Sequence, residues 1–299
     1  MINNVQLGYA CINMTLREQD VYTSRTFSSK NFTLDRASEL AIKNLADLLT
    51  ILNWNVQQGF KVFRIASGLF PRWEKYRVPN LPAYLTIQSL LSAIGQFIKQ
   101  NELRVSFHPD HFVKLAALDP LIRSSSMQEL ENHDMVFETM GINSSYNSKI
   151  NIHVGGAYDD KAETAKRFCQ NFLALSPSLR GRLTVENDDK GALFSVKDLY
   201  EGLYKEIGIP LVFDMHHHQF NTGGLSIQEA FELAYSTWPK GIIPTFHYSE
   251  SRDVGKAAHS DYIAADHFET YGKDLCVIVE AKAKELAVLK YLEKQKVIA

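Results

Sequence analysis

The sequence contains little cysteine and no long hydrophobic run, and both absences narrow the class of protein. Only three cysteines, Cys11, Cys169 and Cys276, occur among the 299 residues. Because they are odd in number, widely separated and not spaced as in a zinc ribbon, we interpret them as reduced core thiols of a cytoplasmic protein. No apolar stretch reaches the roughly 20 residues that a membrane span needs. The first residues also lack the pattern of a secretory signal, so we expect no membrane partner.

Glycine-rich phosphate loops and an excess of positive charge are missing as well. The sequence contains no Gly-x-x-x-x-Gly-Lys-Ser/Thr, no Gly-x-Ser-x-Gly and no dinucleotide fingerprint after its first β-rich run. These absences disfavour a nucleotide cofactor, a Rossmann fold and a serine hydrolase. The formal net charge of -2 argues against a broadly basic nucleic-acid binder. Bound divalent cations would add positive charge that this count omits.

The chain does contain a regular alternation of short β-rich runs and helical segments. The β-rich runs are Val5–Cys11, Phe60–Ala66, Leu103–Phe107, Lys149–Val154, Leu183–Glu186, Pro210–Met215, Ile242–His247 and Leu275–Glu280. Helical periodicity covers Ala37–Gln57, Leu85–Gln100, Met127–Met140, Ala162–Leu175, Val196–Ile207, Ile227–Ala234 and the stretch from Ala281. Eight β-rich runs that alternate with helical segments, with no linker that divides the chain, predict one α/β domain over residues 1–299, a (β/α)8 TIM barrel.

Nearly every predicted strand ends in a residue that can take part in chemistry. In a TIM barrel these strand ends converge on one face, so residues that are distant in sequence would share a pocket. The residues at or just past strand ends are Tyr9, Asn13, Arg64, His108, His111, His153, Glu186, Asp214, His216, His217, His218, His247 and Glu280. Imidazole and carboxylate ligands suit zinc, manganese or iron. Their number exceeds what one ion needs, so we expect two or more ions, as in metal-assisted phosphodiester cleavage.

Each of these residues also has an ordinary structural interpretation. His108, His153 or His247 could simply cap a strand by a backbone hydrogen bond, and Glu280 could pair with the lysines that follow it. A carboxylate such as Glu186 at the end of an apolar strand needs a metal or an arginine partner, because an unpaired buried charge is costly. It is their joint occurrence on nearly all strands that favours a metal site.

Several short motifs, in this order, resemble UV damage endonucleases over about residues 5–285. The motifs are Gly8-Tyr9-Ala10-Cys11-Ile12-Asn13, Phe63-Arg64-Ile65-Ala66-Ser67, His108-Pro109-Asp110-His111-Phe112, Glu186-Asn187-Asp188, Phe213-Asp214-Met215-His216-His217 and His247-Tyr248-Ser249. The resemblance implies a DNA repair enzyme that nicks UV-damaged double-stranded DNA immediately 5′ of cyclobutane dimers and 6-4 photoproducts. The products would carry a 3′-hydroxyl and a 5′-phosphate.

The resemblance also implies a set of metal ligands and two to three divalent ions, often manganese, with zinc or magnesium as alternatives. The implied ligands are His108, His153, Glu186, Asp214, His217, His247, His259 and Glu280. We expect Glu186, Asp214 and Glu280 to be the catalytic carboxylates. The residues alone leave open which of His216, His217 and His218 binds, and the family spacing points to His217. Since Asp214 and His217 would lie on opposite faces of a straight strand, the chain must leave strand geometry near Met215.

Further residues are implied to contact DNA at the lesion. Tyr9 and Asn13 would line a lesion pocket, and His111 and Phe112 match a pair that probes the duplex. The other expected contacts are Arg64, Arg72 and Trp73. Without the resemblance, Phe112 would be interpreted as an inward-packing helix residue and the Arg72 segment as a solvated loop. The chain departs from some family members at Thr245, where they carry a lysine.

The sequence leaves three functions to be compared. The first is the repair endonuclease, a cytoplasmic protein associated with the nucleoid when it acts, which we expect to be a monomer. The second is a divalent-metal sugar isomerase of the xylose isomerase type, and the third is a damage-binding module with structural metals. The long, basic and aromatic loops after the second and third predicted strands favour DNA, and the surplus of ligands favours an enzyme.

Overall fold

A sheet of eight parallel strands forms the centre of the computed structural model, which describes residues 5–298. The strands are β1 (Val5–Ala10), β2 (Val62–Ile65), β3 (Arg104–Phe107), β4 (Ile150–Ile152), β5 (Leu183–Glu186), β6 (Leu211–Val212), β7 (Thr245–Tyr248) and β8 (Leu275–Val279). Their hydrogen-bonded order is β6-β5-β4-β3-β2-β1-β8-β7. The two ends of this sheet meet through a parallel bridge between Asp214 and His247. The predicted TIM barrel is thereby confirmed, with its closure reduced to a single bridge.

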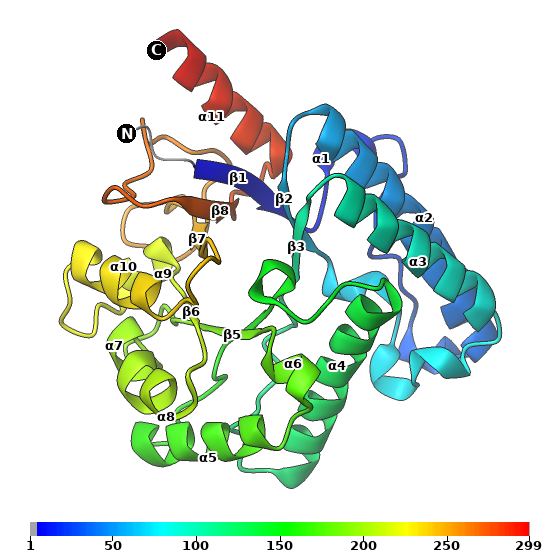
Figure 1. Cartoon of the computed structure of the whole chain (residues 1–299), viewed down its shortest axis with the longest axis horizontal. Coiled ribbons are helices and arrows are strands. Elements are labelled where there is room, and N and C mark those ends of the chain that lie inside the picture. The colour runs from blue at the N-terminus through cyan, green and yellow to red at the C-terminus, as the bar shows by residue number, and fades with distance from the viewer. Residues whose placement is uncertain (1–4, 299) are drawn as a thin grey trace.

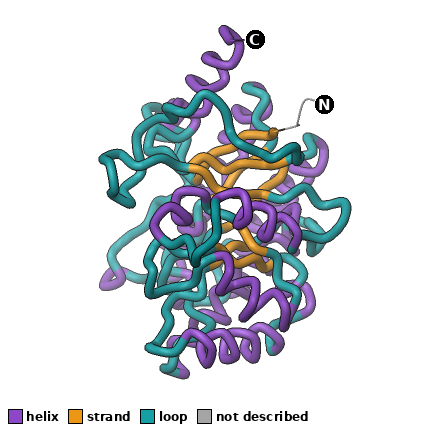
Figure 2. The backbone as a smooth tube through the Cα atoms, turned by 90° about the vertical axis from the view of Figure 1, so that its left-hand side faces the viewer, coloured by secondary structure: helices purple, strands orange, loops and turns teal. Residues whose placement is uncertain are grey.

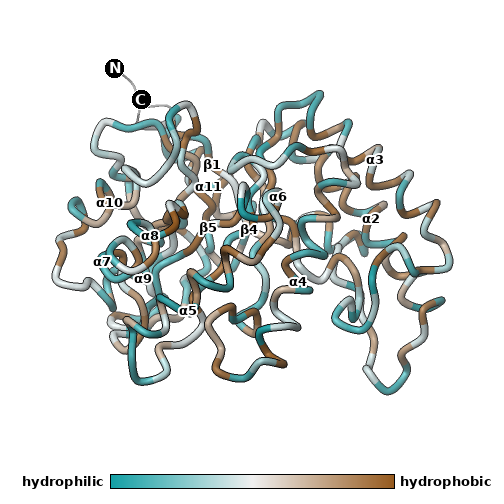
Figure 3. The backbone as a smooth tube through the Cα atoms, turned by 60° about the horizontal axis from the view of Figure 1, so that its bottom comes forward, coloured by the Kyte–Doolittle hydropathy of each residue, from teal (hydrophilic) through white to brown (hydrophobic). Residues whose placement is uncertain are grey.

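Within the described residues a helix follows every strand except β7, and the helices surround the sheet (Figures 1 and 2). They are α1 (Met14–Arg17), α2 (Leu34–Gln57), α3 (Tyr84–Gln100), α4 (Pro120–Thr139), α5 (Lys161–Leu173), α6 (Pro177–Arg180), α7 (Val196–Leu199), α8 (Lys205–Ile207), α9 (Met215–Phe220), α10 (Ile227–Ser236) and α11 (Glu285–Ile298). Hydrophobic and hydrophilic positions alternate along α2 and α3 (Figure 3), as expected for helices with one face on the core. Among the described residues no helix is both long and apolar enough to span a membrane.

Local capping explains where several helices begin. Ser226 and Glu229 form the capping box at the start of α10, and Ser195 and Asp198 form another at the start of α7. In each box the serine hydroxyl accepts from the third helical N–H while the carboxylate accepts from the serine N–H. The helix expected over Val196–Ile207 is present without a break, and its middle, Tyr200–Tyr204, adopts π-helical geometry between α7 and α8.

The sixth strand is shorter than the sequence suggests, and the reason concerns the site. Asp214 is the N-cap of α9, and its Oδ1 accepts the N–H of His217 at 2.8 Å. The chain therefore leaves strand geometry at Asp214 and turns into a helix at Met215, as the spacing predicted. Cys11 likewise lies outside β1, with a φ of 68°, whereas Cys169 and Cys276 are buried core residues as expected.

Candidate metal centre

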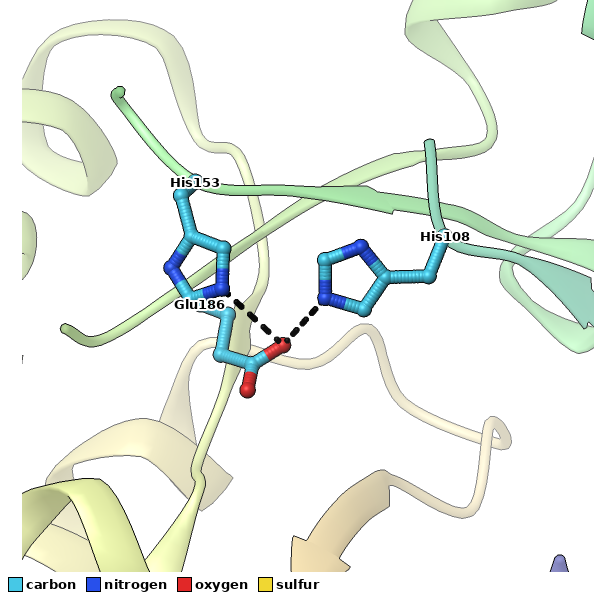
Figure 4. Close-up of side chains that lie close together, drawn as sticks. All are labelled: His108, His153 and Glu186. Atoms are coloured by element: carbon cyan, nitrogen blue, oxygen red, sulfur yellow. Dashed lines mark hydrogen bonds and ion pairs between the residues drawn. The ribbon is translucent and has the colours of Figure 1, made fainter. Parts of the chain in front are cut away.

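Glu186, at the carboxyl end of β5, is the centre of the site. Its side chain is only 1% exposed, and its Oε2 lies 3.1 Å from His108 Nε2 and 3.1 Å from His247 Nδ1. His153 Nε2 is 4.0 Å from the same oxygen (Figure 4). His217 Nδ1 approaches the other oxygen, Oε1, at 3.5 Å. One carboxylate thus gathers four imidazoles from four different segments of the chain.

The parallel register of the barrel brings these rings together. His108 and His153 directly follow β3 and β4, while Glu186 is the last residue of β5 and His247 lies within β7. Parallel strands of a barrel all end at the same face, so each residue at such an end points toward the others. Side chains separated by up to 139 positions in the sequence therefore share one pocket.

Glu280 forms a second part of the site, directly after β8. Arg64 Nη1 of β2 donates to Glu280 Oε1, and His247 Nδ1 lies 3.3 Å from that same oxygen. His259 Nδ1 is 2.8 Å from the backbone oxygen of Glu280 and 3.9 Å from its Oε2. His247 therefore lies between the two carboxylates, and Arg64 lies next to the centre rather than at an outer DNA surface.

Asp214 provides the third carboxylate, held by its backbone as well as by its capping role. Asn187 Nδ2 donates to the Asp214 carbonyl at 3.1 Å, and the Asp214 N–H donates to Asn187 Oδ1 at 2.9 Å. Oδ1 of the carboxylate accepts the N–H of His217, whereas the second oxygen, Oδ2, is buried without a hydrogen-bond partner. His217, one turn along α9, lies 4.0 Å from that free oxygen.

The geometry of these side chains fits divalent ions. Potential ligand atoms lie within 4.8 Å of one another in three overlapping groups: His108, His153 and Glu186; Glu186, Asp214 and His217; Asp214, His247 and Glu280. Asp214 Oδ2 and His247 Nε2 are buried without a hydrogen bond. Because leaving buried polar atoms unsatisfied costs free energy, a cation at this position would complete what the protein leaves open. Imidazole with carboxylate is also a donor set that zinc, manganese and iron accept.

The pKa values of the histidines in the site are shifted in opposite directions. Burial lowers the pKa of His108 to about 4, despite its hydrogen bond to Glu186. Burial alone would also lower the pKa of His153, but the carboxylates of Glu186 and Asp188 outweigh it and raise this pKa to about 9. Burial acts to raise the pKa of Glu186, yet His247 and His153 hold it well below its ordinary value. The centre is thus built to keep its carboxylate ionised.

Of the histidine triple, the structure brings only His217 into the cluster. His216 is fully buried, and its Nε2 lies 3.0 Å from the carbonyl oxygen of Ala257. His218 is also buried and packs edge-on against Phe213. His259 contacts Glu280 from the loop after β7 but is not a member of the three groups among the described residues.

Three supporting residues were missed at the sequence level. Asn151 of β4 donates through Nδ2 to Glu186 Oε2, Asp188 Oδ1 lies 3.1 Å from His153 Nδ1, and the carbonyl oxygen of Asn187 lies 2.9 Å from His217 Nδ1. A signal for Asn151 was present, because residues two apart on a strand share a face and Asn151 precedes His153 by two. Such partners orient metal ligands.

The structure buries Tyr9 and Asn13, which differs from the expectation that both line a lesion pocket. Tyr9 is 0% exposed and donates to Asn55 of α2 at 2.5 Å, and Asn13 Nδ2 donates to the tyrosine oxygen at 2.9 Å. Asn13 also caps α1 through the N–H of Leu16. Alternation along β1 explains the difference, since it turns Tyr9 toward the helix layer. Both side chains stabilise the contact between β1 and α2.

The expected probe residues are exposed, whereas the aromatic loop residue is not. Phe112 is 69% exposed, and the side chain of its neighbour His111 is 74% exposed. Trp73 is 5% exposed and stacks on Phe70, so it is a core residue here rather than a stacking platform for DNA. Arg72 donates through Nε to the carbonyl of Phe27 at 2.9 Å.

A cavity of about 610 Å³ lies beside the exposed phenylalanine. Arg72, Trp73, Phe112 and Glu129 are among the residues that line it. Burial, with the nearby carboxylates of Asp110 and Glu74, raises the pKa of Glu129 to about 7. Ser67 also lines the cavity, and its Oγ donates to the backbone carbonyl of the ligand candidate His108 at 2.9 Å.

At the position of the missing lysine, Thr245 is 4% exposed. A small cavity next to it is also lined by Lys149, a buried residue that precedes β4. Burial lowers the pKa of the Lys149 amine to about 7. The barrel interior therefore retains a lysine below the centre, although it comes from another part of the chain.

A barrel whose strand ends gather histidines and carboxylates around shared open positions is the architecture of a metal-dependent enzyme, and comparison with known proteins identifies its class as an endonuclease. The family model described as UV-endonuclease UvdE matches residues 5–298. The chain belongs to this family, which confirms the resemblance found in the motifs and favours the nuclease over the sugar isomerase.

Individual relatives agree with the assignment. The UV-damage endonuclease of Schizosaccharomyces pombe is 32% identical over 95% of this chain and 49% of its own length. The UV DNA damage endonuclease of Clostridium perfringens is 29% identical over 98% of this chain and 71% of its own. The crystal structure of SacUVDE is similar with a TM-score of 0.87 and 32% identity, and the match covers 99% of each chain. The chain spans about half the length of the S. pombe relative.

Proposed function

We propose that this protein is a repair endonuclease that nicks UV-damaged double-stranded DNA immediately 5′ of the lesion and leaves a 3′-hydroxyl and a 5′-phosphate. The observation that carries the proposal is the Glu186 cluster, with its unsatisfied buried ligand atoms, in a chain of the UV-endonuclease family. The substrates would be cyclobutane dimers and 6-4 photoproducts.

Two or three divalent ions, with manganese as the first choice, would be held by the three carboxylates and by the histidines around them. When bound, such ions supply an activated water near neutral pH and neutralise charge on the scissile phosphate. The ligands are proposed to be His108, His153, Glu186, Asp214, His217, His247, His259 and Glu280. His259 would join through its ring, which already lies 3.9 Å from Glu280 Oε2.

The chain's own residues position these groups. Asn151 fixes one oxygen of Glu186 by a hydrogen bond, and Arg64 fixes one oxygen of Glu280. Each hydrogen bond therefore fixes the orientation of its carboxylate toward the surrounding histidines. The buried surroundings of the cluster exclude bulk water, which strengthens every electrostatic interaction with the phosphate.

Lesion recognition is proposed to use the exposed Phe112 and the cavity beside it. Because damaged bases pair poorly, the duplex opens there at lower cost, and an aromatic wedge can replace the lost stacking. The volume of about 610 Å³ is enough for a nucleotide displaced from the duplex. His111, next to Phe112 and equally exposed, would contact the same opening.

A nicking assay tests the proposed function. Metal-loaded protein is incubated with a UV-irradiated duplex and with an unirradiated duplex of the same sequence, and any cut is mapped at nucleotide resolution. We expect a nick at the 5′ side of dipyrimidine sites in the irradiated duplex only, and none after a chelator is added. Equal cutting of both duplexes, or cutting that persists in chelator, would refute the proposal.

A further inference from the structure

A hairpin in the loop after β7 projects from the metal centre. Ser251 and His259 form an antiparallel bridge, and the N–H of Arg252 donates to the carbonyl of Ala258 at 2.8 Å. The turn closes through the N–H of Lys256, which donates to the carbonyl of Asp253 at 3.0 Å. We call residues 251–259 the 251–259 hairpin. It belongs to the long segment drawn in orange near β7 and β8 in Figure 1.

The base of the 251–259 hairpin is fixed to the centre from two sides. His259 contacts the backbone oxygen of Glu280 at 2.8 Å. On the same arm of the hairpin, the carbonyl of Ala257 lies 3.0 Å from Nε2 of the buried His216, which belongs to α9, the helix that carries His217. The hairpin is therefore held against two segments that carry proposed metal ligands.

The side chains at the tip of the hairpin, in contrast, make few contacts with the rest of the protein. Residues 252–258 are all exposed, and Val254 is 101% exposed. Within the part of the chain that the structure describes, the side chain of Arg252 forms an ion pair only with its neighbour Asp253, at 3.4 Å, and both side chains are more than half exposed. No ion pair or side-chain hydrogen bond of Lys256 is found among the described residues. Two cations flank a fully exposed apolar residue, and a single carboxylate partly offsets them.

The tip of the hairpin is close enough to the metal centre to contact phosphates near a cleavage site. Lys256 is three residues from His259, so their Cα atoms are at most about 11 Å apart. Phosphates of one DNA strand are spaced by about 3.4 Å along the helix axis. The tip is therefore within reach of a phosphate about three nucleotides from a scissile phosphate at the metal centre.

We propose that the 251–259 hairpin is a DNA-binding element whose Arg252 and Lys256 contact phosphates next to the cleavage site. This inference rests on the proposed function, because it takes DNA as the substrate of the centre. Cations at such positions add affinity without reading sequence. Since the hairpin base also carries His259, a phosphate held at the tip fixes the register of the strand relative to the metals.

The test compares two double variants with the same change in charge. Arg252→Gln/Lys256→Gln removes both cations of the hairpin. Lys240→Gln/Lys273→Gln removes two exposed cations at the amino ends of β7 and β8, at the opposite end of the barrel. The dissociation constant for a fluorescent unirradiated duplex is measured by anisotropy with metal-loaded protein over a range of salt concentrations. Thermal unfolding of each variant verifies that it is folded.

We expect the hairpin variant to bind more weakly and to show a shallower salt dependence. Each lost phosphate contact reduces the slope of log affinity against log salt by about 0.9, so the double variant loses about 1.8 and Lys256→Gln alone loses about 0.9. The control double variant keeps the wild-type slope. Equal slopes for the hairpin and control variants, or no binding of the duplex by the wild type, overturn the inference.

Nicking of the irradiated duplex, measured in parallel, separates this inference from the proposed function. Wild-type protein that binds duplex through the hairpin but never nicks irradiated DNA contradicts the proposed function and leaves the hairpin contact intact. Wild-type protein that nicks irradiated DNA, with a hairpin variant identical to the control, contradicts the hairpin contact alone.

Discussion

Asp134 and Asp214 are both buried, yet the carboxylate of Asp134 is paired with an arginine whereas that of Asp214 is not. Asp134 of α4 lies 2.6 Å from Arg182 Nε and also accepts from Ser178 Oγ at 3.1 Å. Its arginine donates further to Ser148 and to the carbonyl of Ile142. Asp214, in contrast, has a carboxylate oxygen that is buried without a partner. Residues of the protein itself pair with Asp134, and we call Asp134 with Arg182 the closed region. Asp214 and Glu186 form the open region, which leaves a position for a ligand that the chain does not supply.

The same difference extends to the surroundings of the two aspartates. An arginine guanidinium matches a carboxylate with fixed donors and stays charged at any ordinary pH. Around Asp214 and Glu186 the neighbours are mostly histidines, which can lose their proton and offer a lone pair to a metal. An open carboxylate among histidines therefore indicates a ligand site, while a carboxylate that is paired with arginine indicates a structural one. Substitutions in the two regions should consequently fail in different ways.

The largest effect is expected for Glu186→Gln. This change keeps the shape of the side chain but removes the charge that draws four imidazoles together. Changes in residues that merely support a metal ligand already cost about 10–100-fold, so nicking should fall by more than about 100-fold. Binding of the lesion duplex should remain close to wild type, as measured by anisotropy. Retained nicking would refute the central role of Glu186.

The next largest effect is expected for Asp134→Asn, which should lower the stability of the fold and leave metal binding unchanged. Asp134→Asn leaves the fully buried Arg182 without its counter-charge. Removing one partner of a buried pair costs about 3–5 kcal/mol, so the free energy of unfolding in urea should fall by about that amount. The protein that remains folded should bind metal as the wild type does. If Asp134→Asn lost metal binding but kept its stability, the structural role assigned to Asp134 would be wrong.

A smaller effect is expected for Asn151→Ala, which tests the support of the open region. Without its hydrogen bond, one oxygen of Glu186 is no longer fixed, and metal affinity should fall by about 10–100-fold. Thr184→Val is the matched control, because Thr184 donates to Asn151 at 2.9 Å and not to the carboxylate. Metal titration followed by calorimetry compares the two. An equal effect of both substitutions would assign Asn151 to general packing.

The smallest effect is expected from pH. Because the pKa of His153 is raised to about 9 in the metal-free protein, its ring is protonated at pH 7 and must release that proton before it can bind a metal. The apparent metal affinity should therefore rise between pH 7 and pH 9, by at most about tenfold per pH unit for one released proton. Titrations at three pH values measure this slope. A flat profile would show that His153 binds no ion.

The sequence predicted the ligand candidates of the open region, but not the residues that orient them, Asn151, Asn187 and Asp188. Strand-terminal positions of Glu186, Asp214 and His247 follow from barrel closure, and the structure brings them together. His259 could not be found in this way, because it lies on a hairpin whose position depends on tertiary contacts. Tyr9 was placed on the wrong side, although alternation along β1 was available in the sequence to correct it.

Side-chain burial in the long loops could not be predicted at all. The segment around Trp73 is polar and basic in sequence, yet the tryptophan is held in the core against Phe70 and His133. Such burial depends on how this segment packs on α4, through His133 and Asn132, and that packing is not visible in local periodicity. Phe112 is exposed because it lies in a turn after β3 and not in the inward-packing helix of its ordinary interpretation.

Anomalous diffraction from crystals soaked in Mn²⁺ tests the central claim most directly. The account predicts two or three strong peaks among the ligand atoms of Glu186, Asp214 and Glu280, and none near Asp134. A map without peaks in the cluster, from crystals of protein that nicks irradiated DNA, would contradict the claim that barrel closure gathers these side chains in order to bind shared cations.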